Sequence, residues 1–168
     1  PDDCVHMGTT SRGTPVDITR TVAQADVRVC LGNIECHYFA GYSGGAKAIM
    51  PGVSTPDAIQ ANHRLMVSPD ACAGKLAGNP IREDIEEAGS ICGIDYIVNV
   101  VLDEHKHIVY AVAGDVTKAH RDGCAYGSEP APRRGKCHPL RAQGRRTICC
   151  SSQWPHSHRR LAPAGADK

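Results

Sequence analysis

Hydrophobic positions along the chain follow two periods, one of about 3.6 residues that is typical of helices and one of two residues that is typical of strands. Apolar residues recur at helical spacing at positions 18, 22 and 25 and again at positions 81, 85, 88 and 92. Each of these segments, and one between them, begins with a capping side chain and a proline: Thr14-Pro15, Thr55-Pro56 and Asn79-Pro80. We therefore expect three helices, and the acids at positions 83, 84, 86 and 87 fall on the side of the third that faces away from its apolar positions.

Strand patterns occupy two other regions of the chain. Residues 27–31 alternate through a short strand that closes at Gly32, and residues 94–102 and 107–113 predict two strands joined by a polar turn. Asp115 is placed to cap a last short helix. These elements together predict an α/β fold, in which helices pack on a largely parallel sheet that carries a C-terminal hairpin.

The composition divides the chain at about residue 126. A chain of 168 residues with 41% hydrophobic residues can form one domain with a real core, and we expect residues 1–126 to be an incomplete domain of this kind. Residues 127–168 hold nine Lys or Arg against two Asp or Glu and few large aliphatic residues, which predicts an unstructured tail of charge +7 beside a body of charge −6. This tail is either a basic disordered segment or the product of a GC-rich gene translated in a wrong frame, and we favour the second interpretation.

Three further features concern the setting of the protein. No apolar run approaches the roughly 20 residues that a membrane-spanning helix needs. Nine cysteines form no Cys-x-x-Cys pair and several lie in apolar stretches, which favours reduced, buried thiols in a cytoplasmic protein. The first residue is Pro1 and no charged and then apolar leader follows, so we expect the sequence to begin inside a longer protein.

The residues with the most informative chemistry lie between positions 37 and 63. His37 follows the first predicted strand, Lys47 ends a glycine-rich loop, and His63 lies on the helix that begins at Pro56. Imidazole can ligate a transition metal or transfer protons near neutral pH, and an uncharged lysine amine can hold a cofactor covalently. The three side chains could therefore bind a metal cofactor and use it.

The glycine-rich loop has glycines at positions 41, 44 and 45 around Ser43, and its backbone N–H groups could approach an anionic group. It is not a P-loop, because Ala46 and Ala48 stand where that motif needs a glycine and a hydroxyl. We therefore exclude nucleoside triphosphate hydrolysis. A plain turn between two elements stays open as the alternative.

Each candidate side chain also has a structural interpretation. Ile59, His63 and Met66 share one face of the predicted helix and are expected to point inward, where a histidine is more often hydrogen-bonded in the core than bound to a metal. Most lysines are solvated charges, so a solvated surface position is the alternative interpretation of Lys47. The remaining candidates are interpreted as surface or structural histidines: His6, His105, His107 and His120.

Four runs of residues, taken together, resemble one known family. They are residues 8–16 (Gly-Thr-Thr-Ser-Arg-Gly-Thr-Pro-Val), Ala25-Asp26, residues 37–52 (His-Tyr-Phe-Ala-Gly-Tyr-Ser-Gly-Gly-Ala-Lys-Ala-Ile-Met-Pro-Gly) and Asn62-His63. They closely resemble the nickel-dependent lactate racemase family, whose members use a nickel-pincer nucleotide. The resemblance covers about residues 5–126 and corresponds to the central part of the N-terminal catalytic domain.

The resemblance implies roles for individual residues. Lys47 resembles the lysine that holds the cofactor, a pyridinium-3-thioamide-5-thiocarboxylic acid mononucleotide, through a thioamide. His63 resembles the protein ligand to nickel, and His37 resembles one of two catalytic acid/base histidines. Further candidates for contact with the cofactor are Gly44, Gly45 and Arg12. The guanidinium of Arg12 could meet a carboxylate or a phosphate by a two-pronged contact, and a structural role in a turn is equally open.

The implied activity is that of a racemase or epimerase of 2-hydroxy acids, an isomerase. In such an enzyme a histidine takes the hydroxyl proton while hydride moves from the α-carbon to the cofactor and then returns to the opposite face. The square-planar preference of Ni(II) suits a pincer with three donor atoms plus one imidazole.

In the family, the second catalytic histidine and the substrate-contacting C-terminal domain lie outside the residues present here. We therefore expect little or no activity from this chain alone, and as partners a small 2-hydroxy acid and the missing N- and C-terminal parts of the parent enzyme. We expect no membrane partner and no nucleic acid. Two other hypotheses stay open: a non-catalytic α/β module that binds anions or a metal, and a nucleic-acid binder that uses the basic tail.

Overall fold

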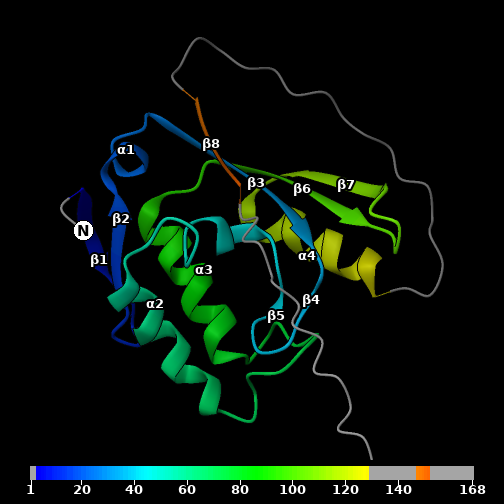
Figure 1. Ribbon diagram of the computed structural model, residues 1–168, viewed down its shortest axis with the longest axis horizontal. Helices are drawn as coiled ribbons and strands as arrows, with labels where there is room; N and C mark the ends of the chain where they lie inside the picture. The colour runs from blue at the N-terminus through cyan, green and yellow to red at the C-terminus, as the bar shows by residue number, and fades with distance from the viewer. Residues whose placement is uncertain (1–2, 129–146, 152–168) are drawn as a thin grey trace, which may run out of the picture.

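The computed structural model describes residues 3–128 and 147–151, in which helices flank three sheets (Figure 1). The strands are β1 (Cys4–Thr9), β2 (Pro15–Thr19), β3 (Val27–Ile34), β4 (Cys36–His37), β5 (Gly41–Tyr42), β6 (Tyr96–Leu102), β7 (Ile108–Gly114) and β8 (Thr147–Ser151). The helices are α1 (Arg20–Ala23), α2 (Pro56–His63), α3 (Pro80–Cys92) and α4 (Val116–Gly127), with the 3₁₀ turns η1 (Gly45–Ala48) and η2 (Arg64–Val67).

The largest sheet has the strand order β7-β6-β3-β8. β3 runs parallel to both of its neighbours, β6 and β8, while β6 and β7 form an antiparallel hairpin. Helix α4 follows the hairpin and packs against β6 and β7 (Figure 1). The predicted α/β class, with a largely parallel sheet and a hairpin late in the chain, is therefore confirmed.

Two apolar clusters hold these elements together. The larger one lies where the β1–β2 hairpin, α3, η1 and the sheet meet, and its fully buried members include Val16, Ile18, Ile49, Met50, Ile81, Ile85 and Ile97. The smaller one joins the sheet to α4 and β5, and it contains Ile34, Tyr42, Val101, Val112 and Cys124. The segment from β4 to η1 is therefore anchored in both clusters, which fixes its position relative to α2 and α3.

Helices α2, α3 and α4 begin where the sequence predicts them. The Asn79 side chain accepts hydrogen bonds from the backbone N–H groups of Ile81 and Arg82, and Asp115 caps α4 in the same way. Thr55 caps α2 through the N–H of Ala58. The apolar positions 81, 85, 88 and 92 of α3 are all buried, as the helical spacing predicts.

The prediction of a helix from Pro15 is wrong. Residues 15–19 form strand β2, and only the four residues of α1 are helical after it. Val16 and Ile18 are buried while their neighbours are partly exposed, so the local period is two. The hydroxyl of Thr14 donates a hydrogen bond of 2.8 Å to Asp84 on α3 and does not cap a helix. Proline is tolerated here because it is the first residue of a strand.

The two predicted helix faces also need correction. Asp84 was placed on the solvent side of α3, but its side chain is fully buried and accepts hydrogen bonds from α2 and from the β1–β2 loop. On α2, the buried residues are Ala58 and Asn62, and Met66 is 45% exposed because α2 ends at His63 before η2 begins. The inward face of α2 is therefore rotated from the predicted one.

The basic tail falls largely outside the described residues, so the interpretations of residues 129–146 and 152–168 stay untested. Helix α4 continues through Gly127, and β8 pairs with β3, which the sequence did not predict. Within residues 3–128 and 147–151, none of the helices is both long enough and apolar enough to cross a membrane.

Candidate active site

Three of the predicted site residues lie around one aromatic ring, that of Phe39. The ring of His37 meets it edge to face with centroids 4.5 Å apart, and the ring of His63 does so at 5.1 Å. The Nζ atom of Lys47 lies 5.9 Å from the centroid of the same ring. Although these side chains come from β4, from the end of α2 and from η1, the fold gathers them around a single buried side chain.

Phe39 lies at the tip of the short β4–β5 hairpin, and a buried amide holds this tip in place. The Asn79 side chain donates a hydrogen bond to the carbonyl oxygen of Phe39 at 2.8 Å while its oxygen caps α3. Gly41 follows at a φ of +75°, and a Cβ there would lie 2.1 Å from the carbonyl oxygen of Lys75. The hairpin tip can therefore approach the α3 cap only because position 41 is glycine.

Burial makes the amine of Lys47 less basic than an ordinary lysine. Desolvation lowers its pKa from 10.5 to about 8, and the positive charge of Arg82 acts in the same direction. At pH 8 about half of such amines are uncharged, compared with roughly one in 300 for a solvated lysine. A larger fraction of Lys47 is therefore available as a nucleophile near neutral pH.

The pKa of the His63 imidazole is lowered as well. Desolvation lowers its pKa below the usual 6.5, and the nearby charge of Lys47 lowers it further. Because only a neutral imidazole has a free lone pair, this environment favours the form that can ligate a metal.

The glycine loop is held by one side chain from each of three elements. Arg82 of α3 donates from Nη1 to the carbonyl oxygens of Tyr42 and Gly44, at 3.2 and 3.4 Å. His120 of α4 lies with Nε2 2.7 Å from the carbonyl oxygen of Ser43, and Asn99 of β6 accepts the N–H of Gly45 at 2.7 Å. All three side chains are buried. We call them the loop clamp: Arg82, Asn99 and His120.

Gly44 and Gly45 are both required by this packing. Their φ angles are +76° and +60°, and a Cβ on Gly44 would lie 2.8 Å from the side-chain oxygen of Asn99. A Cβ on Gly45 would lie 2.8 Å from Nη2 of Arg82. The N–H of Gly45 is already bound to Asn99, so the visible role of this glycine is close packing. Contact of the two glycines with a cofactor stays a prediction.

Arg12 is exposed and lies on the loop between β1 and β2. Its Nη2 atom donates to the Glu83 carboxylate of α3 at 2.7 Å, in a contact through one nitrogen. The carboxylate that it meets in this structure therefore belongs to the chain itself. A role for Arg12 in binding the cofactor stays a prediction.

A buried hydrogen-bond network connects the β1–β2 loop to α2 through α3. Asp84 accepts hydrogen bonds from the hydroxyls of Thr10 and Thr14 and from the amide of Asn62. Asn62 is 1% exposed and directly precedes His63. The orientation of His63 is therefore tied, through its neighbour, to the packing of α3 against the β1–β2 loop.

The side chains around Phe39 fit a cofactor that brings its own metal donors. Within residues 3–128 and 147–151, no three His, Cys, Asp or Glu side chains are grouped so that they could hold a metal ion. A metal at His63 would thus have fewer than three ligands of these kinds from the described residues, and a bound group could supply the others. The amine of Lys47 lies beside the same ring and has the lowered pKa that a covalent attachment requires.

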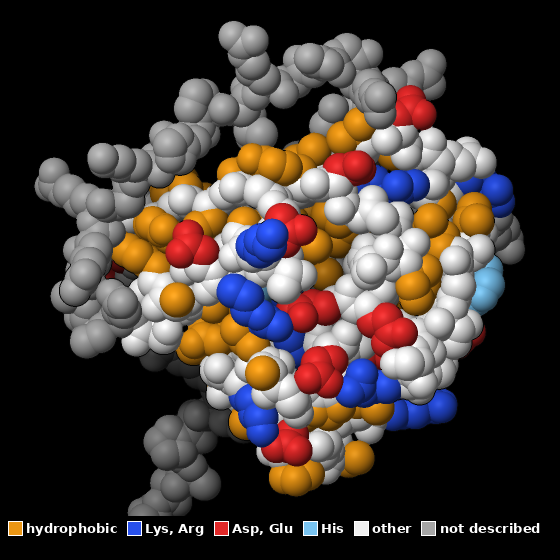
Figure 2. All heavy atoms as spheres, turned by 180° about the vertical axis from the view of Figure 1, so that it is seen from behind, with side chains coloured by type: hydrophobic (Ala, Val, Ile, Leu, Met, Phe, Trp, Pro, Cys, Tyr) orange, Lys and Arg blue, Asp and Glu red, His pale blue; other side chains and the backbone are white. Residues whose placement is uncertain are grey.

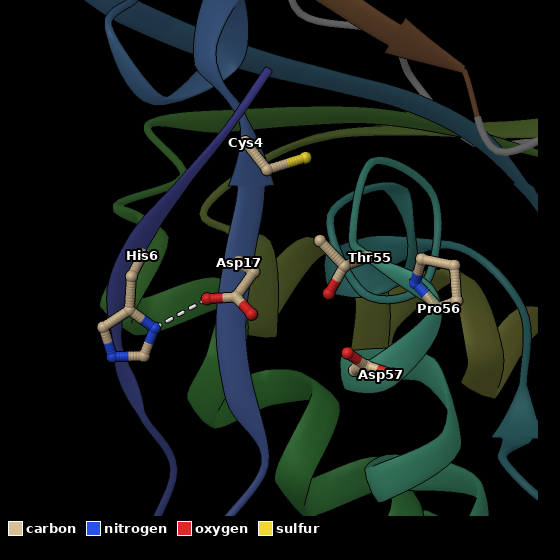
Figure 3. Close-up of a pocket in the computed structure, with 6 residues that line it drawn as sticks. All are labelled: Cys4, His6, Asp17, Thr55, Pro56 and Asp57. Carbon is tan, nitrogen blue, oxygen red and sulfur yellow. Dashed lines mark hydrogen bonds and ion pairs between the residues drawn. The ribbon is translucent and has the colours of Figure 1, made fainter. Parts of the chain in front are cut away.

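One cavity, of about 460 Å³, lies elsewhere on the molecule. It is lined by Cys4, His6, Asp17, Thr55, Pro56 and Asp57. Figure 3 shows His6 pointing to Asp17 across the β1–β2 hairpin. The Nδ1 atom of His6 lies 2.6 Å from Oδ1 of Asp17. The cavity lies at the start of α2, whereas His63 is the last residue of that helix. Neither His37 nor Lys47 lines it, so we place the candidate site around Phe39.

The sequence pattern does not identify the loop clamp or Phe39 as parts of the site. His120 was interpreted as surface or structural, and it is fully buried in a structural position. Arg82 and Glu86 are four residues apart and form an ion pair, a spacing that is usually a surface feature of helices. The one available signal was Phe39 itself, because it is the chain's single phenylalanine and lies between His37 and Lys47.

Comparison with known proteins identifies relatives over most of the described residues. The model of the lactate racemase N-terminal domain family matches residues 1–74. Lactate racemase from Lactiplantibacillus plantarum is 39% identical over 127 residues, and lactate racemase from Thermoanaerobacterium thermosaccharolyticum is 41% identical over 127 residues. Each alignment covers 74% of this chain, which spans about 30% of the length of these curated relatives.

Solved structures agree with this assignment. The structure of the lactate racemase apoprotein from T. thermosaccharolyticum superposes with a TM-score of 0.73 at 38% identity, covering 74% of this chain and 30% of that one. A crystal structure of a protein from Thermotoga maritima superposes with a TM-score of 0.59 at 20% identity over 76% of this chain and 37% of that one, which shows a shared fold. Over the residues that these comparisons match, the chain belongs to the lactate racemase family.

Proposed function

We propose that this chain carries the cofactor-attachment segment of a racemase or epimerase that acts on 2-hydroxy acids and uses a nickel-pincer nucleotide. The observation that supports this most strongly is the convergence of Lys47, His63 and His37 on the ring of Phe39. Residues of these three types, when they lie around one ring, can provide a covalent anchor, a metal ligand and a proton carrier. The family relationship supports the same assignment.

Lys47 is the proposed attachment point. Its lowered pKa provides the uncharged amine that condensation with a thiocarboxylate requires, in which the new C–N bond replaces a C–O bond, sulfur stays on carbon and water leaves. The ring of Phe39 shields one side of this amine, and η1 holds its backbone. Once the amine has become part of a neutral thioamide, the cost of burying its charge disappears. The same burial that weakens the charged amine therefore stabilises the attached form.

His63 is the proposed protein ligand of nickel. Its lowered pKa keeps the imidazole neutral near pH 7, so that metal binding does not have to displace a proton. When bound, the nickel-pincer nucleotide supplies a reversible acceptor for the hydride of the substrate α-carbon. Lys47 and His63 would hold this group between them, and the edge-to-face contact with Phe39 sets the angle of the imidazole.

His37 is the proposed carrier of the substrate hydroxyl proton. Its Nδ1 atom accepts the backbone N–H of Ala40 at 3.4 Å, so a neutral ring in this position carries its own proton on Nε2. A proton taken from the substrate at Nδ1 would replace this long hydrogen bond. The ring of Tyr38 stacks on His37 with centroids 5.1 Å apart and an angle of 11°, which limits its rotation.

The activity of the whole enzyme needs more than this chain contains. The chain spans about 30% of the length of its curated relatives, and we propose that the second acid/base histidine and the side chains that select the substrate belong to the remaining parts. We therefore expect little racemisation from the chain alone. A cytoplasmic location stays a prediction from the cysteine content.

The test is intact-mass measurement after incubation with the mature nickel-pincer nucleotide. We expect one adduct on the wild-type chain, located on the peptide that contains Lys47, and none in Lys47→Ala. Lys118→Ala is the matched control, because Lys118 is exposed on α4, and it should form the adduct as the wild type does. Unmodified mass in both the wild type and Lys118→Ala would count against the proposal.

Two further observations bear on the alternatives. Nickel binding that depends on His63 without any adduct on Lys47 would favour a metal-binding module that is not an enzyme. For a nucleic-acid binder we would expect a continuous basic surface, whereas the face in Figure 2 carries Lys and Arg interspersed with Asp and Glu. The tail, on which that hypothesis depends, lies mainly outside the described residues.

A further inference from the structure

The loop clamp joins three elements that are distant in sequence to four consecutive residues of backbone. Its members lie on α3, β6 and α4, and they bind the polar backbone atoms of residues 42–45. The N–H of Lys47 in turn donates to the carbonyl oxygen of Gly44 at 3.3 Å, and this oxygen also accepts from Arg82. The clamp therefore acts on the turn from which the Lys47 side chain starts.

The hydrogen bonds determine the protonation of His120. A carbonyl oxygen can only accept, so the 2.7 Å contact with Ser43 requires a proton on Nε2 of His120. The Nη2 atom of Arg82 can only donate, and it lies 3.0 Å from Nδ1 and 3.2 Å from Nε2. Because Nε2 carries the proton for Ser43, Nδ1 is the nitrogen that can accept from Arg82. The ring is therefore neutral, in agreement with a pKa lowered to about 3 by burial and by the charge of Arg82.

Arg82 is a buried charge whose donors are directed to specific partners. Its side chain is 1% exposed, and its Nε atom pairs with Glu86 at 2.8 Å. Its other two nitrogens bind the two loop carbonyls and His120. A guanidinium that is buried at such a cost needs nearly all of these partners, so the loop cannot move without leaving a buried donor unpaired.

We propose that the loop clamp is a positioning device that holds residues 42–45 in the conformation that directs Lys47 towards the ring of Phe39. The side chains of the clamp are at most 1% exposed and act on Lys47 through the loop backbone, so its members are positioning residues. This inference rests on the proposed function for its biological role, because the amine must be directed to the place where His63 can reach the same cofactor. The geometry itself can be measured without any cofactor.

The test compares two substitutions of His120 by NMR. In His120→Gln the side-chain amide can still donate to the carbonyl oxygen of Ser43 and accept from Arg82. The leucine side chain of His120→Leu can do neither. The measured signature is the nuclear Overhauser effect between the ε-protons of Lys47 and the ring protons of Phe39, with circular dichroism and thermal melting as measures of folding. We expect the effect in the wild type and in His120→Gln, and its loss in folded His120→Leu.

Two outcomes would overturn the inference. The first is a folded His120→Leu that keeps the nuclear Overhauser effect between Lys47 and Phe39. Loss of a histidine with a merely structural role would lower stability without releasing the lysine. If His120→Leu does not fold, the same measurement is made on Asn99→Ala, which removes the hydrogen bond to the N–H of Gly45. Loss of the effect is again the expected result. The second is loss of the effect in folded His120→Gln, because the conservative substitution should rescue it.

Measurement of adduct formation separates this inference from the proposed function. If Lys47 is never modified while the clamp substitutions still release it from Phe39, the proposed function fails and the positioning role stands. If folded His120→Leu forms the adduct as fast as the wild type, the clamp has no role in attachment, and the proposed function stands.

Discussion

Replacing Lys47 by methionine should stabilise the folded chain, and the gain should depend on pH. The folded state holds this amine partly away from water, and its pKa is lowered from 10.5 to about 8. Methionine has a similar length and no charge, so it can occupy the same place beside Phe39 without the cost of desolvation. A lysine retained at such a cost is typical of a functional position.

The size of the gain follows from the pKa. Each pKa unit corresponds to about 1.4 kcal/mol, so the full shift corresponds to about 3 kcal/mol of stability lost while the amine is charged in both states. Below pH 8 both folded and unfolded chains carry the charge, and the whole cost applies. Between pH 8 and 10.5 the folded chain binds fewer protons than the unfolded chain, so stability rises with pH and the cost disappears. Because part of the side chain reaches solvent, we expect a gain of about 1–3 kcal/mol.

The assay is urea unfolding of the wild type and Lys47→Met at several pH values from 6 to 10. The difference in the free energy of unfolding should be largest at pH 6–7 and should fall to about half near pH 9.5. Lys118→Met is the control, because Lys118 is exposed on α4, and it should change stability by less than about 0.5 kcal/mol at every pH.

A gain that is the same at all pH values would refute the reasoning, because it would come from packing and not from charge. A loss of stability in Lys47→Met at pH 6 would also refute it. Such a loss would mean that the charged amine is stabilised by partners and not penalised by burial.

The remaining predictions concern the packing around the site. Asp84→Ala should lower the free energy of unfolding by about 3–5 kcal/mol in urea titrations, because two hydroxyls and the amide of Asn62 lose their buried acceptor; a loss below 1 kcal/mol would contradict the network. Gly45→Ala should cost about 2–4 kcal/mol, because it combines a φ of +60° with contacts of 2.8–3.0 Å to the clamp. Gly13→Ala has a φ of +83° but nothing within 4 Å, so it should cost only about 1 kcal/mol, and equal losses at the two glycines would contradict the close packing at Gly45.

The same capping signal was right at two positions and wrong at a third. Thr55 and Asn79 cap helices, while Thr14 bonds to Asp84 and is followed by a strand. The Thr-Pro pair is locally compatible with both outcomes, and the partner that decides between them lies 70 residues away. The sequence therefore predicts elements well where the cap is local and less well where a long-range hydrogen bond competes.

The same distinction applies to the site. His37, Lys47 and His63 could be proposed from residue types, spacing and resemblance, and the structure brings them together around Phe39. The loop clamp could not be predicted, because arginine and asparagine are mostly exposed, histidine is intermediate, and no local pattern marks the ones that are buried. Their partners are backbone carbonyls and an N–H group of the loop, which every sequence contains.

The proximity of Lys47 and His63 is tested most directly by an NMR pH titration of the His63 ring in the wild type and in Lys47→Met. In the wild type the charge of Lys47 contributes to lowering the pKa of His63, so its removal should raise that pKa. The signals of the exposed histidines His6, His105 and His107 serve as internal controls. An unchanged pKa of His63 in a folded Lys47→Met chain would mean that the two side chains do not share one site.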